Sequence, residues 1–452
     1  MNQTPPLQKN DDIELTIDTL TLEGQGVGRK DGFAVFVPGA LPGEEVSAHV
    51  IKVSPAYAVA KLMNVITPSP DRVEPRCPVY ALCGGCAFQH MDYAAELRFK
   101  EQAVADALMR LGGFSSVPLR PIIGMEHPWR YRNKGSFPIG HMGNTVVAGF
   151  YAERSHRLIP VTDCPIQTEK AMDVVRRVTE WANTYSVSAY DELTHRGVLK
   201  HVMARTSVDG QTMAVIVTTT ERLKHSEALI SLLADVDSVY QNVNPDDTNV
   251  IFGKTFKLLS GVPAITETVG KLSFTVSPQS FLQVNPAQTE RLYGAAVDLL
   301  KPAESETIVD AYCGIGTISL LVAKRAGRVI GVESVAEAIE DAKQNAAQNG
   351  IENASFLCGD AAAELEALRK RESIAALVAD PPRKGMDERM VTAILEANIP
   401  RLVYVSCNPA TLARDSKLLA AGGYTLSAVQ SVDMFPRTGH VETCVLLSHK
   451  NS

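Results

Sequence analysis

The 452-residue sequence predicts an α/β protein whose carboxyl-terminal part is a doubly wound, Rossmann-like parallel sheet. From about residue 276, short apolar runs alternate with helical stretches, which is typical of a parallel sheet covered on both faces. Residues 11 to about 66 form short alternating runs separated by turn signals, which predicts a small OB-like barrel. A cysteine-bearing segment of mixed helix and strand patterns joins them. We therefore expect three parts: residues 1–70, 71–275 and 276–452.

The composition favours a folded protein, because 45% of the residues are hydrophobic and 21% are charged. The formal charge of −7 argues against a protein that coats nucleic acid indiscriminately. The first residues, MNQTPPLQKNDDIEL, lack a basic start followed by an apolar stretch, and no run of eighteen apolar residues occurs in the chain. We therefore expect a cytoplasmic monomer that does not contact a membrane.

The first part carries the string LTLEGQGVGRKDGFAVFVPGALPGEEV, which resembles a TRAM domain, an OB-like barrel of RNA-modifying enzymes. A proline-rich linker, TPSPDRVEP, follows it. Residues 93–111 then place apolar side chains at helical spacing and end at Gly112 and Gly113, which predicts a helix with a glycine cap.

A local basic cluster lies in the middle part. It consists of Arg120, Arg130, Arg132 and Lys134, with the rings of Trp129, Tyr131 and Phe137 interleaved. Charge runs are often only solvated surface, but bases stack on aromatic rings beside cations. We take Arg130, Arg132, Lys134 and the more distant Phe281 as candidate RNA-binding residues.

A glycine turn, DAYCGIGT, begins at Asp310 between a predicted strand and helix, where small residues allow a ligand to approach the backbone. A dinucleotide-binding turn favours a third glycine three positions after Gly316, and Ser319 occupies that position. Glu333 and Asp360 end the next two strands. This arrangement resembles the S-adenosylmethionine site of class I methyltransferases, although either carboxylate could instead cap the following helix.

The next strand ends in Asp380-Pro-Pro-Arg. Two prolines fix the turn and remove two backbone donors, which favours an Asp380 carboxyl that faces the cleft. A similar motif faces the base in methyltransferases that act on nucleobases, where an aspartate could bind the imide N–H. A plain rigid turn is the alternative.

Cys407 ends one further strand, in VSCNP, and parallel topology brings it to the same edge as Asp380. The C5 carbon of uracil is too weak a nucleophile to take a methyl group unless a thiolate first adds at C6. A base must afterwards remove the C5 proton. Glu442, in TGHVETCVLL, is the candidate base, and His440 is its competitor because its ordinary pKa lies nearer neutrality.

Five motifs occur in order: FLQVN, DAYCGIGT, DPPRKG, VSCNP and GHVET. Together with the barrel they resemble the RNA uridine-5-methyltransferase family, most closely its 23S ribosomal RNA enzymes. The resemblance implies that Cys407 is the nucleophile, Glu442 the base and Asp380 a base-recognition group beside the cofactor. It also implies a lining for the S-adenosylmethionine site: Gln283, Tyr312, Gly314, Glu333 and Asp360.

The remaining cysteines divide into two groups. Cys77, Cys83 and Cys86 form a C-x5-C-x2-C pattern, and Cys164 follows about eighty residues later. Four thiolates can hold zinc or an iron–sulfur cluster. The resemblance to the ribosomal enzymes implies a [4Fe–4S] cluster with a structural role. We expect Cys313, Cys358 and Cys444 to be core residues.

The sequence thus predicts S-adenosylmethionine-dependent methylation of C5 of a uridine in 23S ribosomal RNA, at an unpaired or loop nucleotide. The same chemistry on a transfer RNA uridine is the alternative. An iron–sulfur oxidoreductase and a non-catalytic RNA-binding protein are the rival classes.

Overall fold

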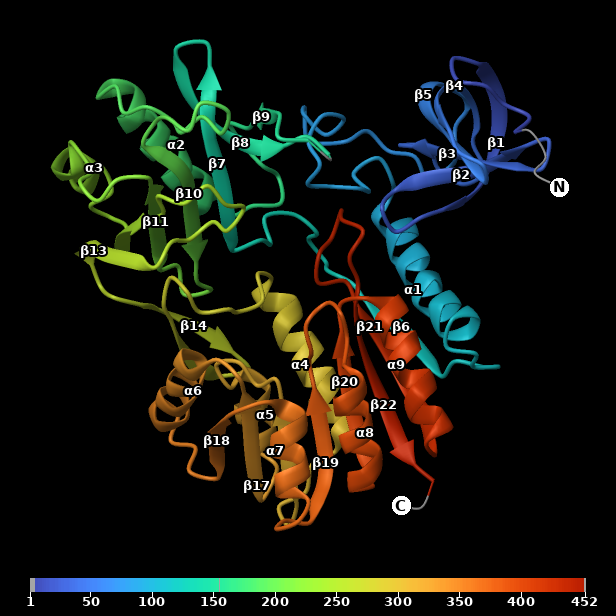
Figure 1. Ribbon diagram of the computed structural model, residues 1–452, viewed down its shortest axis with the longest axis vertical. Coiled ribbons are helices and arrows are strands. Elements are labelled where there is room, and N and C mark those ends of the chain that lie inside the picture. The colour runs from blue at the N-terminus through green and yellow to red at the C-terminus, as the bar shows by residue number, and fades with distance from the viewer. Residues whose placement is uncertain (1–4, 154, 451–452) are drawn as a thin grey trace. The chain divides into compact units, whose positions relative to one another are not determined.

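The computed structural model describes residues 5–153 and 155–450 (Figure 1). The chain forms two compact units. The smaller unit combines Met1–Ala103 with a distant segment, Phe435–His440, and the larger unit contains Val104–Met434 and Val441–Ser452. The middle and carboxyl-terminal parts therefore fall mostly into one unit, while the expected boundaries at residues 70 and 275 stay predictions.

The smaller unit contains the barrel that the sequence predicts. Its strands are β1 (Asp12–Leu20), β2 (Gln25–Lys30), β3 (Phe33–Pro38), β4 (Glu45–Val53) and β5 (Tyr57–Thr67). They close in the order β1-β2-β3-β5-β4, and the buried side chains alternate along β1 as a half-buried strand requires. The OB-like fold of the TRAM resemblance is confirmed.

Helix α1 (Tyr93–Arg110) follows the barrel and ends two residues before Gly112, as the apolar spacing predicts. Gly113 adopts a left-handed φ of 76°, which glycine tolerates at a helix end.

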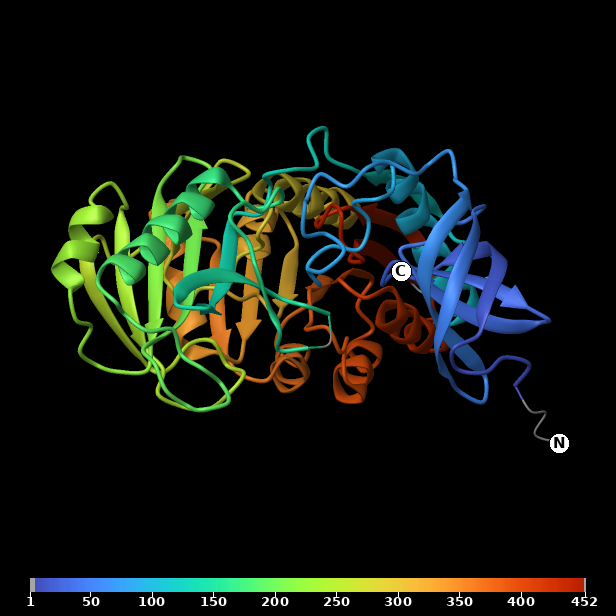
Figure 2. The same cartoon turned by 90° about the horizontal axis from the view of Figure 1, so that it is seen from above.

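The larger unit begins with a seven-stranded sheet of order β13-β12-β11-β10-β7-β8-β9. Its elements are β7 (Lys134–Met142), β8 (Thr145–Tyr151), β9 (Leu158–Pro160), α2 (Glu169–Thr184), β10 (Leu199–Thr206), β11 (Thr212–Thr218), α3 (Ser226–Leu232), β12 (Ser238–Val243) and β13 (Thr255–Gly261). Helix α2 packs its apolar face on β8 and β10, and Figure 2 shows it lying across the sheet. A hairpin of β14 (Ile265–Val269) and β15 (Leu272–Val276) follows.

The second sheet has the order β18-β17-β16-β19-β20-β22-β21-β6. Its elements are β6 (Leu119–Ile123), α4 (Pro286–Leu300), β16 (Thr307–Ala311), α5 (Thr317–Ala323), β17 (Arg328–Glu333), α6 (Ala336–Gln348), β18 (Ala354–Cys358), α7 (Ala361–Leu368), β19 (Ile374–Ala379), α8 (Glu388–Ala397), β20 (Arg401–Ser406), α9 (Pro409–Ala421), β21 (Tyr424–Val432) and β22 (Glu442–His449). Strands β16 to β20 are parallel, whereas β22 runs antiparallel to both β20 and β21.

This sheet confirms the predicted Rossmann-like fold. Apolar side chains from β16, β17, β19 and β20 form one core with residues of α7, α8 and α9, which cover one face. Helix α4 packs on β20, β21 and β22 (Figure 1). The edge strand β6 comes from residues well before position 276, so the sheet recruits a strand that the sequence pattern assigns to the middle part.

One expected core residue is placed differently. Cys313 and Cys444 are buried, as expected, but Cys358 is exposed. It is the last residue of β18, which is an edge strand of the sheet and therefore leaves its end open to solvent. In the described ranges, no helix combines the length and the apolar character needed to cross a membrane.

Candidate functional site

The candidate site lies where the parallel strands of the larger unit end. Tyr312 follows β16, Asp380 follows β19 and Cys407 follows β20, and these three strands are neighbours in the sheet. Carboxyl ends of adjacent parallel strands meet at one edge, which is where ligands bind such sheets. The strand order therefore brings together side chains that the sequence separates by up to 95 positions.

Cys407 and Glu442 flank the end of the antiparallel pair β20–β22, and the Glu442 charge acts on the Cys407 thiol. The last paired residues are Ser406 and Thr443, so Cys407 is one step beyond this pair on one strand and Glu442 one step beyond it on the other. Directly opposed residues of an antiparallel pair project to the same face. The register thus joins the predicted nucleophile to the predicted base.

The turn that holds Cys407 is well defined. The Ser406 hydroxyl accepts a hydrogen bond from the Asn408 amide at 3.2 Å, and the Asn408 side chain accepts from Ala410 N at 2.9 Å as the cap of α9. Pro409 occupies the first turn of that helix, where its missing N–H costs nothing. Cys407 is half-buried beside the amino end of α9, and a helix amino end favours the thiolate form of a cysteine.

Buried carboxyls surround this thiol. Burial raises the pKa of Glu442 to about 8, and the neighbouring Asp380 carboxylate raises it further while Arg383 lowers it. Burial also raises the pKa of Asp380 to about 7. The pKa of the Cys407 thiol is raised, first by burial and then by the Glu442 charge. Among the described residues, no hydrogen-bond donor reaches the Asp380 or Glu442 carboxyl.

Two further residues face this group, and sequence reasoning assigned neither of them. Arg383, the last residue of the DPPR turn, is the cation whose charge lowers the pKa values of both Cys407 and Glu442. Tyr293 on α4 is buried, and burial followed by the Asp380 and Glu442 charges raises the pKa of its hydroxyl. The DPPR motif contained a signal for Arg383, whereas Tyr293 is one apolar-face residue of an ordinary helix.

The glycine turn provides a second group of polar atoms. Tyr312, Gly314 and Gly316 have left-handed φ angles of 67°, 54° and 85°, so the backbone folds back sharply after β16. Glu333, at the end of β17, accepts hydrogen bonds from Gly314 N at 3.3 Å and from Ser334 N at 2.7 Å. A positive φ is uncommon at a residue with a side chain such as Tyr312, so the surrounding structure holds this turn in a strained conformation.

Asp310 is the buried acceptor of this second group. Its Oδ2 accepts from the Ser319 hydroxyl at 2.5 Å, but its Oδ1 is buried and has no hydrogen-bond partner among the described residues. Burial raises the pKa of Asp310 to about 7, and the Asp380 charge adds to this effect. A buried, unsatisfied acceptor at a strand end is a position that a ligand donor would complete.

The other predicted cofactor residues lie at the margins of this edge. Asp360 caps α7 by accepting from Ala363 N at 3.1 Å and pairs with Arg389 at 3.3 Å, so the capping alternative describes its observed contacts. Gln283 lies near Tyr293 on α4, and its side chain lowers the pKa of the Tyr293 hydroxyl, against the larger effect of burial.

The predicted RNA-binding residues differ in their surroundings. Arg130 forms a forked ion pair with Asp163, with both N–O distances at 2.7 Å, so its guanidinium is engaged within the protein. Burial, then the charges of Arg205 and Arg132, lowers the pKa of Lys134 to about 7. Phe281 is 72% exposed.

The interleaved rings do not form the expected stacking surface. Phe137 is buried on β7, and Tyr131 is buried in the segment before that strand, so neither ring is open for a base to stack on it. The candidate RNA-binding roles of Arg132 and Phe281 stay predictions.

The four cysteines of the expected cluster give no support to a metal site. Cys77, Cys83 and Cys86 belong to the smaller unit, whereas Cys164 belongs to the larger one. Within the described ranges, no group of three or more His, Cys, Asp or Glu side chains is arranged to hold a metal ion. Cys83 Sγ instead accepts from Gly85 N at 3.4 Å, and burial raises the pKa of the thiol. We derive no step through a cluster.

Comparison with known proteins places this arrangement in a family. A model of tRNA (uracil-5-)-methyltransferases matches residues 268–450, and a TRAM model matches residues 6–63. A protein of Halalkalibacterium halodurans named as an uncharacterized RNA methyltransferase is 49% identical over 99% of both chains. One from Bacillus cereus with the same description is 46% identical over 98% of both.

A solved structure resembles the whole chain. The Pyrococcus abyssi tRNA (uracil-54, C5)-methyltransferase, in complex with S-adenosyl-L-homocysteine, has a TM-score of 0.78 and 26% identity. The match covers 96% of this chain and 100% of that one. With relatives this similar over their full length, the chain belongs to the RNA uracil-5-methyltransferase family.

Proposed function

We propose that the protein methylates C5 of a uridine in 23S ribosomal RNA, with S-adenosylmethionine as the methyl donor. The observation that supports the proposal is the end of the β20–β22 ladder at Ser406 and Thr443, which brings Cys407 and Glu442 near each other at the strand edge that also bears Asp380. The reaction needs one nucleophile and one base on the same substrate ring.

Cys407 begins the reaction. Its thiolate adds to C6 of the uracil, so a C6–S bond forms and the ring electrons move toward C5 and the adjacent carbonyl. The amino end of α9 and the Arg383 charge favour the thiolate, whereas burial and Glu442 oppose it. The electron-rich C5 then takes the methyl group.

Glu442 completes the reaction. After C5 carries the methyl group, the Glu442 carboxylate removes the C5 proton, the C5–C6 double bond re-forms and the C6–S bond breaks. A pKa of about 8, raised by burial, makes this carboxylate a much stronger base than an exposed glutamate. Glu442 is the better supported of the two candidate bases, because its charge acts on the Cys407 thiol and the His440 ring is not among the groups that shift the pKa of that thiol.

Asp380 fits a recognition role. Its carboxyl is half-buried, faces Glu442 and Cys407 and receives no hydrogen bond from the described residues. The imide N–H of uracil can donate to such a carboxylate, whereas the corresponding nitrogen of cytosine carries no hydrogen. Asp380 would thus select uracil over cytosine.

The residues around the glycine turn fit S-adenosylmethionine. When bound, this cofactor supplies an electrophilic methyl group on a sulfonium. The Asp310 Oδ1 atom, buried and without a partner, would accept from its ammonium group, and Glu333 would accept from its ribose hydroxyls. Tyr312 and Gly314 would shape the turn around it.

Ribosomal RNA is our preferred substrate because a TRAM barrel accompanies the large-subunit enzymes that the sequence motifs resemble. Transfer RNA is the second candidate. It is favoured by the match, over nearly the whole chain, to the Pyrococcus abyssi enzyme, whose substrate is a transfer RNA uridine.

The [4Fe–4S] prediction is separate from this proposal. Iron and sulfide analysis of protein purified without oxygen tests it, and colourless protein with bound zinc would contradict it.

The test offers labelled S-adenosylmethionine to 23S ribosomal RNA and to transfer RNA, both from cells that lack this protein. We expect label in 5-methyluridine of ribosomal RNA, and none when Cys407 is replaced by alanine. Label only in transfer RNA would keep the chemistry and reject the ribosomal substrate. Label in neither RNA would reject the proposed reaction.

A further inference from the structure

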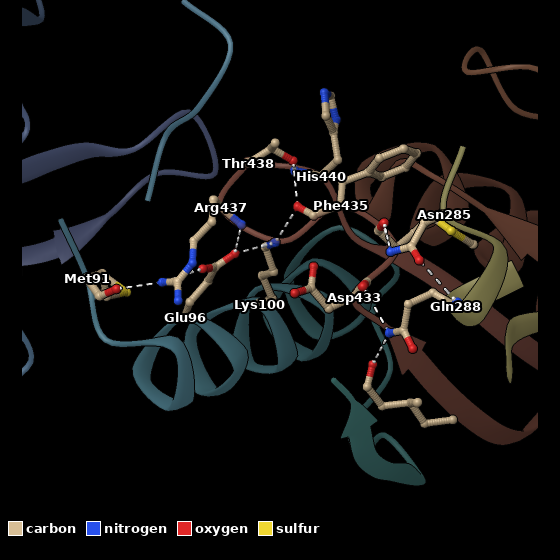
Figure 3. A network of polar contacts seen from close by, with 12 residues as sticks. Met91, Glu96, Lys100, Asn285, Gln288, Asp433, Phe435, Arg437, Thr438 and His440 are labelled. Atoms are coloured by element: carbon tan, nitrogen blue, oxygen red, sulfur yellow. Dashed lines mark hydrogen bonds and ion pairs between the residues drawn. The ribbon is translucent and has the colours of Figure 1, made fainter. Parts of the chain in front are cut away.

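The connection between β21 and β22, residues 433 to 441, leads directly to Glu442. Its first two residues are held within the larger unit by the start of α4. Asn285 Nδ2 donates to Met434 O at 2.9 Å, and Gln288 Nε2 donates to Asp433 O at 3.0 Å (Figure 3). Both amides are buried and bind the main chain, so they fix the path of the backbone as it leaves β21.

The next six residues, Phe435–His440, belong to the smaller unit, and we call them the 435–440 loop. Arg437 is the buried centre of this loop. Its backbone N donates to Glu96 Oε1 at 2.7 Å, and its Nη1 donates to Met91 O at 2.9 Å (Figure 3). Its carbonyl accepts from the amides of Ala87 and Phe88 at 2.8 and 3.0 Å.

Two side chains on adjacent turns of α1 complete this contact. Lys100 Nζ donates to Glu96 Oε1 at 2.8 Å and to Phe435 O at 3.2 Å, and both side chains are fully buried. Buried charges are costly unless they are paired and hydrogen-bonded, and this group meets both conditions. The loop is therefore held by strong, directional contacts and not only by apolar packing.

The backbone of the 435–440 loop is also constrained by an uncommon conformation, a close approach to another segment and a side-chain hydrogen bond. Arg437 has a left-handed φ of 69°, which is uncommon for a residue with a side chain. Gly439 passes so close to Leu22 O that an added Cβ would lie 1.8 Å from it. Thr438 braces the turn by donating to Phe435 O at 2.8 Å. Strained conformations persist where the surroundings determine them, and they gather at functional sites.

We infer that Arg437 is a positioning residue for the Glu442 carboxyl, which it aligns through the 435–440 loop. This inference rests on the proposed role of Glu442 as the base. Only Val441 separates the loop from Glu442, so a displaced loop shifts the base but leaves Cys407 and the glycine turn in place. The 435–440 loop would thereby act on one step of the reaction, the removal of the C5 proton.

The test compares Arg437→Gln, Arg437→Lys and Thr438→Ala with the wild type and with Glu442→Gln. Arg176→Gln is the matched control, because Arg176 forms only exposed ion pairs on α2. Each protein is incubated with its RNA substrate and labelled S-adenosylmethionine. Released 5-methyluridine and the covalent protein–RNA adduct that carries the methyl group are then measured separately. Binding of S-adenosylmethionine is measured on each variant as a check on the larger unit.

We expect Arg437→Gln to slow product release about tenfold to a hundredfold while the methylated adduct accumulates, because misplacing a base by about 1 Å costs this much. Arg437→Lys and Thr438→Ala should show smaller effects of the same kind, and the control should behave as the wild type does. Normal release by Arg437→Gln, with adduct accumulating only in Glu442→Gln, would overturn the inference and leave the proposed function intact. Loss of cofactor binding together with activity, without adduct, would also overturn it. If the wild type forms neither product nor adduct, the proposed function itself fails.

Discussion

Two groups of carboxyl side chains differ in whether the protein itself provides hydrogen-bond donors to them. At the strand edge, the carboxyls of Asp380 and Glu442 receive no hydrogen bond from the described residues, and burial raises their pKa values to about 7 and 8. In the smaller unit, the buried Glu96 accepts from Lys100 and from the Arg437 backbone. The protein therefore pairs one carboxylate with its own donors and, among the described residues, provides no donor to the other two.

This difference explains how one chain can be both stable and reactive. A paired buried charge fixes a conformation, and breaking the pair is expensive. An unpaired buried carboxyl costs stability, but it gains basicity and a free position for a ligand donor. The 435–440 loop joins the two kinds of site, because it begins among satisfied charges and ends next to Glu442.

The largest expected effect is a loss of methyl transfer when Cys407, next to the unpaired carboxyls, is replaced. Replacing Cys407 by alanine removes the thiol that we propose forms the bond to C6. We expect methyl transfer to fall by more than about 10⁴-fold. Binding of S-adenosylmethionine, measured by calorimetry, should be unchanged because the glycine turn is intact.

The matched control for that variant is Cys358→Ala, which removes an exposed thiol at the end of β18. It should retain full activity. Turnover by Cys407→Ala at a rate near that of the wild type would contradict the proposed mechanism.

The next largest expected effect is a loss of stability when the paired buried charges of the smaller unit are disrupted. Glu96→Gln leaves Lys100 and Arg437 buried together without their shared carboxylate. We expect a loss of about 3–5 kcal/mol in the stability of the smaller unit. Hydrogen exchange of the amides of α1 measures this loss locally, which avoids treating a two-unit chain as a single transition.

Glu180→Gln is the comparison for this variant, since Glu180 pairs with Arg176 on the exposed face of α2. A surface pair contributes about 0–1 kcal/mol, so the exchange rates should barely change. Equal losses in both variants would mean that the Glu96 group does not stabilise the unit as its burial implies.

The sequence predicted the fold well because its signals are local and periodic. Alternating burial along β1 and the apolar spacing of α1 follow directly from side-chain geometry, and the strand ends at Asp380 and Cys407 follow from the turn motifs. The alternation of strands and helices therefore predicted both the fold class and the sheet edge at which the candidate site lies.

Contacts made by distant segments were not predictable in this way. No local pattern shows that Arg437 is held by Glu96, or that Tyr293 on α4 faces the carboxyl cluster, because these contacts depend on tertiary packing. The burial of the rings beside the basic cluster was unpredictable for a related reason. Phe137 on β7 and Tyr131 in the segment before it are buried, and composition alone does not distinguish buried rings from exposed ones.

The smallest expected effect is a change in stability with pH that depends on the Glu442 carboxyl. The pKa of Glu442 is about 8 in the folded protein against an ordinary value of 4.5, so the folded state keeps its proton to higher pH than the unfolded chain does. The stabilisation that this proton provides is complete below about pH 4.5 and is lost as the pH rises to about 8. Glu442→Gln carries no charge at any pH, so its stability relative to the wild type should increase by roughly 1–3 kcal/mol between pH 5 and pH 8. Hydrogen exchange of the amides of β20 and β22, compared between the two proteins at each pH, measures this change locally. A difference that does not depend on pH would show that the carboxyl is already ionised at pH 5, and Glu442 would then resemble the satisfied charges of the smaller unit.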